Sequence, residues 1–148
     1  MLRSPGAILL LALLAGAAAR ADQERATFLV SATVPGRVTI EPLVQSSKLV
    51  ITADDVRRGY KEVSARFLVS QNTERGWVLR LSPRIGITEQ VKVRGLSTDV
   101  VLRGETVEVY RPATAGAEDI SLGFHMVLAA DAEPGTYDMP VHVAATAL

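Results

Sequence analysis

The two histidines come first, because a neutral imidazole is the commonest ligand that proteins offer to transition metals. His125 and His142 are the only histidines among 148 residues, and both fall on the polar positions of alternating segments near the end of the chain. They could therefore share one exposed face and, with Asp138, offer three ligands to a metal ion. A structural zinc site needs four ligands, and the chain has no cysteine. We expect surface histidines and no metal ion or cofactor.

Two pairs of adjacent carboxylates could serve a glycosidase, which works with two carboxyl groups. These pairs are Asp54-Asp55 and Glu118-Asp119. Glycosidase carboxyl groups oppose each other across a cleft, whereas sequence neighbours more often form a helix cap or a solvated loop. The segment Gly95–Asp99 (GLSTD) lacks the second glycine of a G-x-S-x-G nucleophile elbow. We expect no catalytic residue and no enzyme activity.

Arginines are numerous, and Arg80 and Arg84 flank Pro83 at the end of an alternating segment. They could face an acidic partner or a polysaccharide. The chain contains 16 basic and 16 acidic residues, and this balance favours a solvated surface of paired charges. It also argues against electrostatic capture of nucleic acid or of an anionic membrane.

The start of the chain has the layout of a secretory signal peptide. Arg3 precedes an apolar run, Ala7–Ala19, which is shorter than the about 20 apolar residues that cross a bilayer. Ala19-Arg20-Ala21 forms a cleavage site, with Ala17-Ala18-Ala19 as a competing site and an uncleaved membrane anchor as the alternative. We expect residues 1–21 to be removed, which leaves Asp22 at the N-terminus of an exported protein: periplasmic, cell-surface or secreted.

Residues 22–148 favour strands by period and composition. Apolar residues alternate over Ala26–Val34, Pro35-Gly36 predicts a turn, and Pro42 marks an edge or a bend. A helical turn capped by Thr52 and ended by Gly59 is expected. The further expected strands are Val38–Ile40, Lys48–Thr52, Val63–Ser70, Trp77–Ser82, Val91–Val93, Val100–Arg103 and Thr106–Tyr110.

The end of the chain gives the clearest alternation. Two apolar series, Ile120–Leu128 and Tyr137–Ala145, are separated by a loop that contains Pro134-Gly135. This pattern predicts an antiparallel hairpin, with Phe124 and Val141 in the core and both histidines facing away from it.

Many short strands with glycine and proline between them predict a single all-β domain over residues 22–148. We expect an immunoglobulin-like antiparallel β-sandwich of about seven to nine strands. Trp77, on the apolar face of its strand, is expected to pack in the core.

Three segments resemble small secreted β-sandwich proteins. They are Phe28–Val34 (FLVSATV), Asn72–Leu81 (NTERGWVLRL) and Ala132–Tyr137 (AEPGTY). Together they resemble spore-coat-U type pilins and WxL-type surface domains, which implies a secreted pilin-like fold. The chain departs from the pilins at Pro35-Gly36-Arg37, where one of the family cysteines would be expected, and from WxL domains in having a single tryptophan. Only Asp22–Arg25 precedes the first expected strand, whereas donor-strand exchange needs an N-terminal extension of about a strand's length.

These observations predict a non-enzymatic extracytoplasmic structural or interaction protein, including an accessory role in a surface or pilus-like assembly. Its partners would be proteins that pair with exposed strand edges, with no nucleic acid and no membrane insertion after signal cleavage. The alternative is a soluble periplasmic binding module for a small ligand or glycan.

Overall fold

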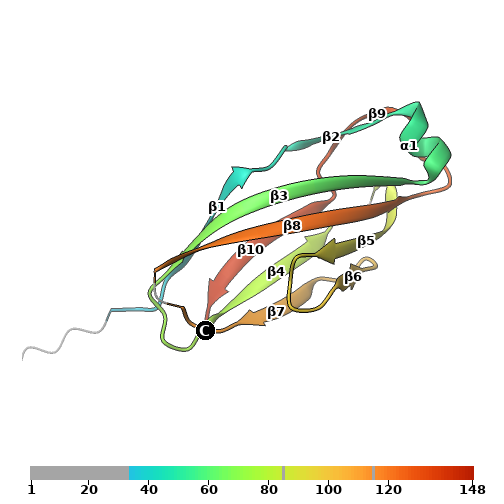
Figure 1. Cartoon of the computed structure of the whole chain (residues 1–148). Coiled ribbons are helices and arrows are strands. Elements are labelled where there is room, and N and C mark those ends of the chain that lie inside the picture. Colours follow the sequence, from blue (N-terminus) through green and yellow to red (C-terminus); the bar gives the residue numbers. More distant parts are fainter. Residues whose placement is uncertain (1–33, 85, 115) are drawn as a thin grey trace, which may run out of the picture. The chain divides into compact units, whose positions relative to one another are not determined.

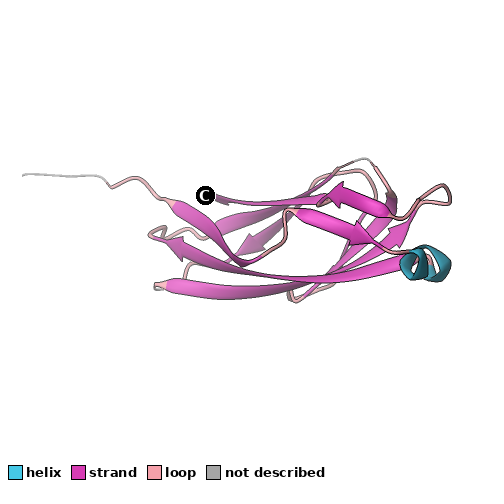
Figure 2. Ribbon diagram, turned by 90° about the horizontal axis from the view of Figure 1, so that it is seen from above, coloured by secondary structure: helices cyan, strands magenta, loops and turns pink. Residues whose placement is uncertain are grey.

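The computed structural model describes residues 34–84, 86–114 and 116–148, which form two facing layers of strands and one short helix (Figure 1; Figure 2). In chain order the elements are β1 (Val38–Val44), β2 (Lys48–Ile51), α1 (Ala53–Arg58), β3 (Tyr60–Gln71), β4 (Trp77–Pro83), β5 (Thr88–Arg94), β6 (Val100–Leu102), β7 (Val107–Arg111), β8 (Ala117–Leu128), β9 (Gly135–Asp138) and β10 (Val141–Ala147).

The described strands form three antiparallel groups. A five-stranded sheet has the order β1-β3-β8-β5-β6, a three-stranded sheet has the order β10-β4-β7, and β2 pairs with β9 in a short ribbon. The all-β sandwich predicted from the sequence is confirmed. The structure has ten strands, one more than the expected upper number, because the last expected strand is divided into β9 and β10.

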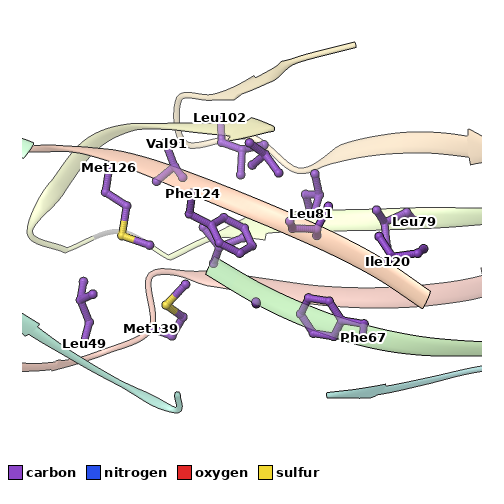
Figure 3. Close-up of a cluster of buried hydrophobic side chains, with 14 of the residues drawn as sticks. Leu49, Phe67, Leu79, Leu81, Val91, Leu102, Ile120, Phe124, Met126 and Met139 are labelled. Atoms are coloured by element: carbon purple, nitrogen blue, oxygen red, sulfur yellow. The ribbon is translucent and has the colours of Figure 1, made fainter. Parts of the chain in front are cut away.

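The core lies between the layers and is built by alternation along the strands. In β4 the side chains of Trp77, Leu79 and Leu81 are fully buried, which confirms the expected position of Trp77. From the opposite sheet, β8 contributes every second residue, and Figure 3 shows this cluster with Phe124 near its centre. Burial of each such side chain stabilises the fold by about 1.5–3 kcal/mol relative to an exposed position. Together these side chains hold the two layers of strands against each other.

The single helical turn forms where local sequence signals predict it. Thr52 caps α1: its Oγ1 accepts from the Asp55 N–H at 3.2 Å, while Asp55 Oδ2 accepts from the Thr52 N–H at 3.0 Å. This reciprocal capping box satisfies two backbone donors that the helix leaves free. Gly59 ends the helix with φ of 76°, a left-handed conformation that glycine adopts without strain.

The predicted terminal hairpin is wrong. β8 lies inside the five-stranded sheet between β3 and β5, whereas β9 pairs with β2 and β10 pairs with β4 in the other sheet. Met139 and Pro140 interrupt the series Tyr137–Ala145, and the chain crosses to the opposite layer there. Alternation fixes which side chains are buried, so Phe124 and Val141 are buried as predicted, but it does not select the partner strand.

The beginning of the described chain differs from the sequence expectation. The predicted strand Ala26–Val34 lies outside the described residues except for Val34, which is exposed and belongs to no strand. The turn predicted at Pro35-Gly36 is wrong, because residues 34–37 are not in a turn. Instead, the Arg37 N–H donates to Asn72 Oδ1 at 2.5 Å and the Asn72 N–H donates to the Arg37 carbonyl at 3.1 Å, which holds Arg37 in line with β1.

Candidate functional site: a groove between two free strand edges

Among the edge strands of the described sandwich, β1 and β10 lie beside each other. β1 pairs with β3, and β10 pairs with β4. Their other edges border a common groove of about 370 Å³ that residues of both strands line. The expected edge or bend at Pro42 is confirmed, because β1 is an edge strand with an irregularity between Pro42 and Val44. A strand edge without a neighbour presents unpaired N–H and C=O groups. The groove therefore offers a partner both backbone hydrogen-bonding groups and apolar surface.

The floor of the groove belongs to the core. Phe67 from β3, Val141 from β10 and Met139 just before it lie at the bottom and are almost fully buried. Ile40 and Pro42 form the wall on the β1 side. Figure 3 shows Phe67 and Met139 below Phe124 in the buried cluster, and both also line the groove.

The rim of the groove is polar and basic. Gln45, Ser47, Arg84 and His142 line it, and none of the described lining residues is acidic. Asp138, which lines a neighbouring pocket together with Arg84, accepts from Lys48 Nζ at 2.7 Å. This hydrogen bond, the charge of Lys48 and the more distant charge of Arg84 lower the pKa of Asp138. The carboxylate of Asp138 is therefore already paired with Lys48.

The groove lies along the first part of β10, at Val141, His142 and Val143. At the far end of β10, a Cβ atom on Gly36 would lie 3.8 Å from Ala147 Cβ, so the chain before β1 packs against the end of β10. At the start of β10, the Arg84 N–H donates to the Pro140 carbonyl at 2.7 Å. That backbone bond anchors Arg84 beside the groove.

Exposed apolar side chains continue from the groove along the chain. Leu43 and Val44 at the end of β1, and Val50 in β2, are each at least half exposed. Isolated exposed apolar residues are normal, but these three follow closely in the sequence after Ile40, which lines the groove. They extend the surface that a partner would cover.

The two histidines, which the sequence alone could have placed on one face, lie in different sheets. His125 lies on β8, where its ring stacks on Tyr60 with centroids 4.9 Å apart and its Nδ1 lies 3.2 Å from Glu62 Oε1. His142 lies on β10 at the rim of the groove. In the described part of the chain no group of three or more histidine, aspartate or glutamate residues could hold a metal ion.

The paired carboxylates do not oppose each other across a cleft. Asp54 bonds Arg57, and Asp119 Oδ2 accepts from Arg66 at 2.5 Å. Glu118 in β8 bonds Arg111 in β7. These are structural ion pairs.

Asp55 is the one buried carboxylate of the described chain, and the hydrogen bonds that it accepts explain how its charge can be buried. Lys61 Nζ donates to its Oδ2 at 2.8 Å, Arg58 bonds its other oxygen, and Thr52 donates from both its N–H and its hydroxyl. The bond from Lys61 contributes most to holding the pKa of Asp55 far below its usual value, followed by the bonds from Thr52. A permanently ionised, fully bonded carboxylate stabilises the link between α1 and β3 and has no free proton to transfer.

The remaining residues that the sequence analysis singled out either form ion pairs or line the groove. Arg80 forms two hydrogen bonds to Glu108 Oε1, at 2.9 and 2.6 Å, as expected for a balanced surface. Asp99, at the end of the GLSTD segment, pairs with Lys92 at 2.9 Å. Arg84 is the exception, because it lines the groove.

Sequence reasoning missed the groove. The available signal was Pro140, which lacks an N–H and interrupts an otherwise regular alternation between Met139 and Val141, two residues that line the groove.

Searches of protein-family models, curated proteins and solved structures found no match to this chain. Among the described residues no helix is long and apolar enough to cross a membrane.

Proposed function

We propose that this chain is an exported, non-enzymatic structural or interaction protein that binds an extended strand of a partner in the groove between β1 and β10. The observation that carries the proposal is that two free strand edges flank one apolar groove. A partner strand that adds to such an edge gains main-chain hydrogen bonds, and the pockets for its alternate side chains give specificity.

The sequence of β10 supports this role. Exposed edges are usually protected against association by charged residues, above all lysine. β10 reads VHVAATA and has one ionisable residue, His142, at the rim of the groove. Its edge is therefore permissive to pairing, while the buried floor supplies apolar surface for side chains of the incoming strand.

Export is part of the proposal and rests on the signal-peptide pattern of residues 1–21. Outside the cytoplasm, a protein without a catalytic constellation in its described part and with an open strand edge is suited to assembly. An accessory role in a surface or pilus-like structure fits that description, as does the sequence resemblance to small secreted pilin-like proteins.

The second candidate is a binding module for a small ligand or glycan. The groove volume of about 370 Å³ favours it, because small-molecule pockets usually measure about 300–1,000 Å³. Strand binding explains the groove better, since a partner strand uses the free backbone edges of β1 and β10 along their length.

Site-specific photocrosslinking tests the proposal in cells that export the protein. A photoreactive amino acid replaces Val44, beside the groove, and a matched variant carries it at Val101, an exposed residue of β6 at the opposite edge of the five-stranded sheet. We expect protein adducts from position 44 whose crosslinked peptide is an extended apolar segment, and far fewer from position 101.

Two results would reject strand binding. One is equal crosslinking from both positions. The other is the absence of any protein adduct at position 44 together with a rise in the melting temperature on adding a mono- or oligosaccharide, which would favour the small-ligand candidate.

A further inference from the structure

The outer face of the three-stranded sheet carries a set of polar side chains that strand binding does not use. In β4 the fully buried residues alternate with residues that point away from the core. Because the strand period is two, Arg80, Ser82 and, just after the strand, Arg84 share this outer face. The Arg84 N–H donates to the Pro140 carbonyl at 2.7 Å, which continues the pairing of β4 with β10 by one residue and keeps Arg84 in register.

His142 in β10 lies among these residues. It is directly opposite Ser82 in the register of β10 with β4, and Arg84 occupies the diagonal position beyond Ser82. Directly opposite side chains have Cβ atoms about 4.5–5.5 Å apart, and a long side chain at the diagonal position still comes within reach. Arg84 and His142 also line the same groove, so both side chains approach the rim beside β10. The register therefore gathers a guanidinium, an imidazole and a hydroxyl from two distant segments.

A neighbouring threonine orients the hydroxyl of Ser82. Thr106, just before β7, donates from its Oγ1 to Ser82 Oγ at 3.0 Å. A hydroxyl has one donor and two acceptor sites, so Ser82 keeps its own O–H to donate. The cluster thus offers the Ser82 O–H, the guanidinium of Arg84 and the ring N–H groups of His142, and all three favour an anionic acceptor.

The carboxylates on the adjoining strands are bonded to other cations. Glu108 in β7 accepts two hydrogen bonds from Arg80, and Asp138 in β9 accepts one from Lys48. In the described part of the chain no carboxylate forms an ion pair with Arg84. Arg84 therefore keeps its guanidinium for a ligand, whereas Arg80, on the same face, is already engaged.

We propose that Arg84, His142 and Ser82 form a binding site for a tetrahedral oxyanion, namely a phosphate or sulfate group. A guanidinium binds two oxygens of such a group at once, which adds geometric specificity to the charge. A phosphate group offers three acceptor oxygens, enough for the three donor groups that converge here, whereas a carboxylate has two oxygens in one plane. This site goes beyond the proposed strand binding, because it uses side chains on the outer face and no free backbone edge.

Titration of the isotope-labelled exported protein with sodium sulfate, followed by its amide NMR resonances, locates and measures the site. We expect saturable shifts of the amides of Ser82, Arg84 and His142. Arg84→Gln should weaken binding by at least about tenfold, because it removes a charge-assisted bidentate contact. Arg80→Gln is the matched control, since Glu108 already occupies this guanidinium, and should weaken binding by less than about threefold. Both arginines are exposed, so both variants are expected to fold.

The pH dependence of sulfate binding tests the part played by His142. An unperturbed imidazole gains its charge as the pH falls from about 8 to about 5, whereas sulfate keeps the same charge throughout. We expect binding to tighten by about three- to tenfold over this range, and His142→Gln to remove most of that change. His125→Gln, a matched change in the other sheet, should leave the pH dependence in place.

Two further titrations identify the source of the anion. Inorganic phosphate and a sugar phosphate that bind equally would show that the free anion suffices, and tighter binding of the sugar phosphate would show that an ester is recognised. Either result supports the site.

Four results would overturn the proposal. They are the absence of saturable shifts at millimolar sulfate, equal losses for Arg84→Gln and Arg80→Gln, a pH dependence that survives His142→Gln, and an acidic peptide of glutamates that binds as tightly as sulfate. The last result would assign the cluster to an acidic protein partner instead. The wild-type titration maps the site by itself, so it decides the matter even if a variant fails to fold.

Discussion

Phe124 and His125 are neighbours in β8 with opposite surroundings. The side chain of Phe124 is 1% exposed and lies in the core between the layers (Figure 3), whereas His125 lies on the outer face beside Tyr60 and Glu62. The sequence predicted this difference because the strand period is two, and a single slip would have exposed every apolar residue of the series.

We therefore expect Phe124→Ala to lower the free energy of unfolding by about 3–5 kcal/mol, as large-to-small changes in a core do. His125→Ala should cost less than about 1 kcal/mol, because the stacking on Tyr60 and the contact with Glu62 are partly solvated. Urea unfolding of both variants measures the difference. A larger loss for His125→Ala would contradict the assignment of the two faces of β8.

At the scale of elements, local sequence signals predicted the short helix correctly, whereas the pairing partners of the last strands were predicted wrongly. The helix α1 was predictable because its capping residues, Thr52 and Gly59, lie within the helix's own short segment. The pairing of β8 with β3 and β5, and of β10 with β4, joins segments far apart in the sequence. No local pattern encodes such a choice, which depends on how all the apolar faces are buried together.

A glycine pair tests how closely β5 approaches β8. Gly95 and Gly104 both have positive φ, 95° and 94°, but a Cβ atom at Gly95 would lie 2.1 Å from the Ser121 carbonyl oxygen, whereas at Gly104 it would meet nothing within 4 Å. Gly104→Ala should cost about 1–2 kcal/mol from backbone strain alone.

Gly95→Ala carries the same strain and must also displace the backbone of β8, so we expect an additional loss of about 1–3 kcal/mol. Chemical denaturation of the two variants compares them directly. Equal costs at both positions would mean that the end of β5 can move away from Ser121 freely.

At the scale of the whole molecule, the groove exists only because two edge strands meet. β1 and β10 lie in different sheets and are separated by most of the chain, so the alignment of Ile40 and Pro42 with Met139 and Val141 could not be predicted from local patterns. The sequence did supply the chemistry that the groove uses, namely the alternating apolar residues and Arg84. Topology brings them together.

The proposed export of this chain predicts a defined first residue after cleavage of the leader. Cleavage after Ala21 leaves Asp22 and Glu24 at the start of the chain, together with the α-amino group, whereas cleavage after Ala19 would add Arg20 in front of them. We expect cleavage after Ala21, because Ala19 and Ala21 occupy the −3 and −1 positions that signal peptidases recognise as small residues.

Intact-mass measurement of the exported protein identifies the first residue. The expected mass is that of Asp22–Leu148, and a cytoplasmic sample from export-blocked cells, which retains the leader, is the control. A mass that corresponds to a chain beginning at Arg20 would show cleavage after Ala19 instead. An exported protein that keeps Met1 would show that the apolar run Ala7–Ala19 is an uncleaved anchor.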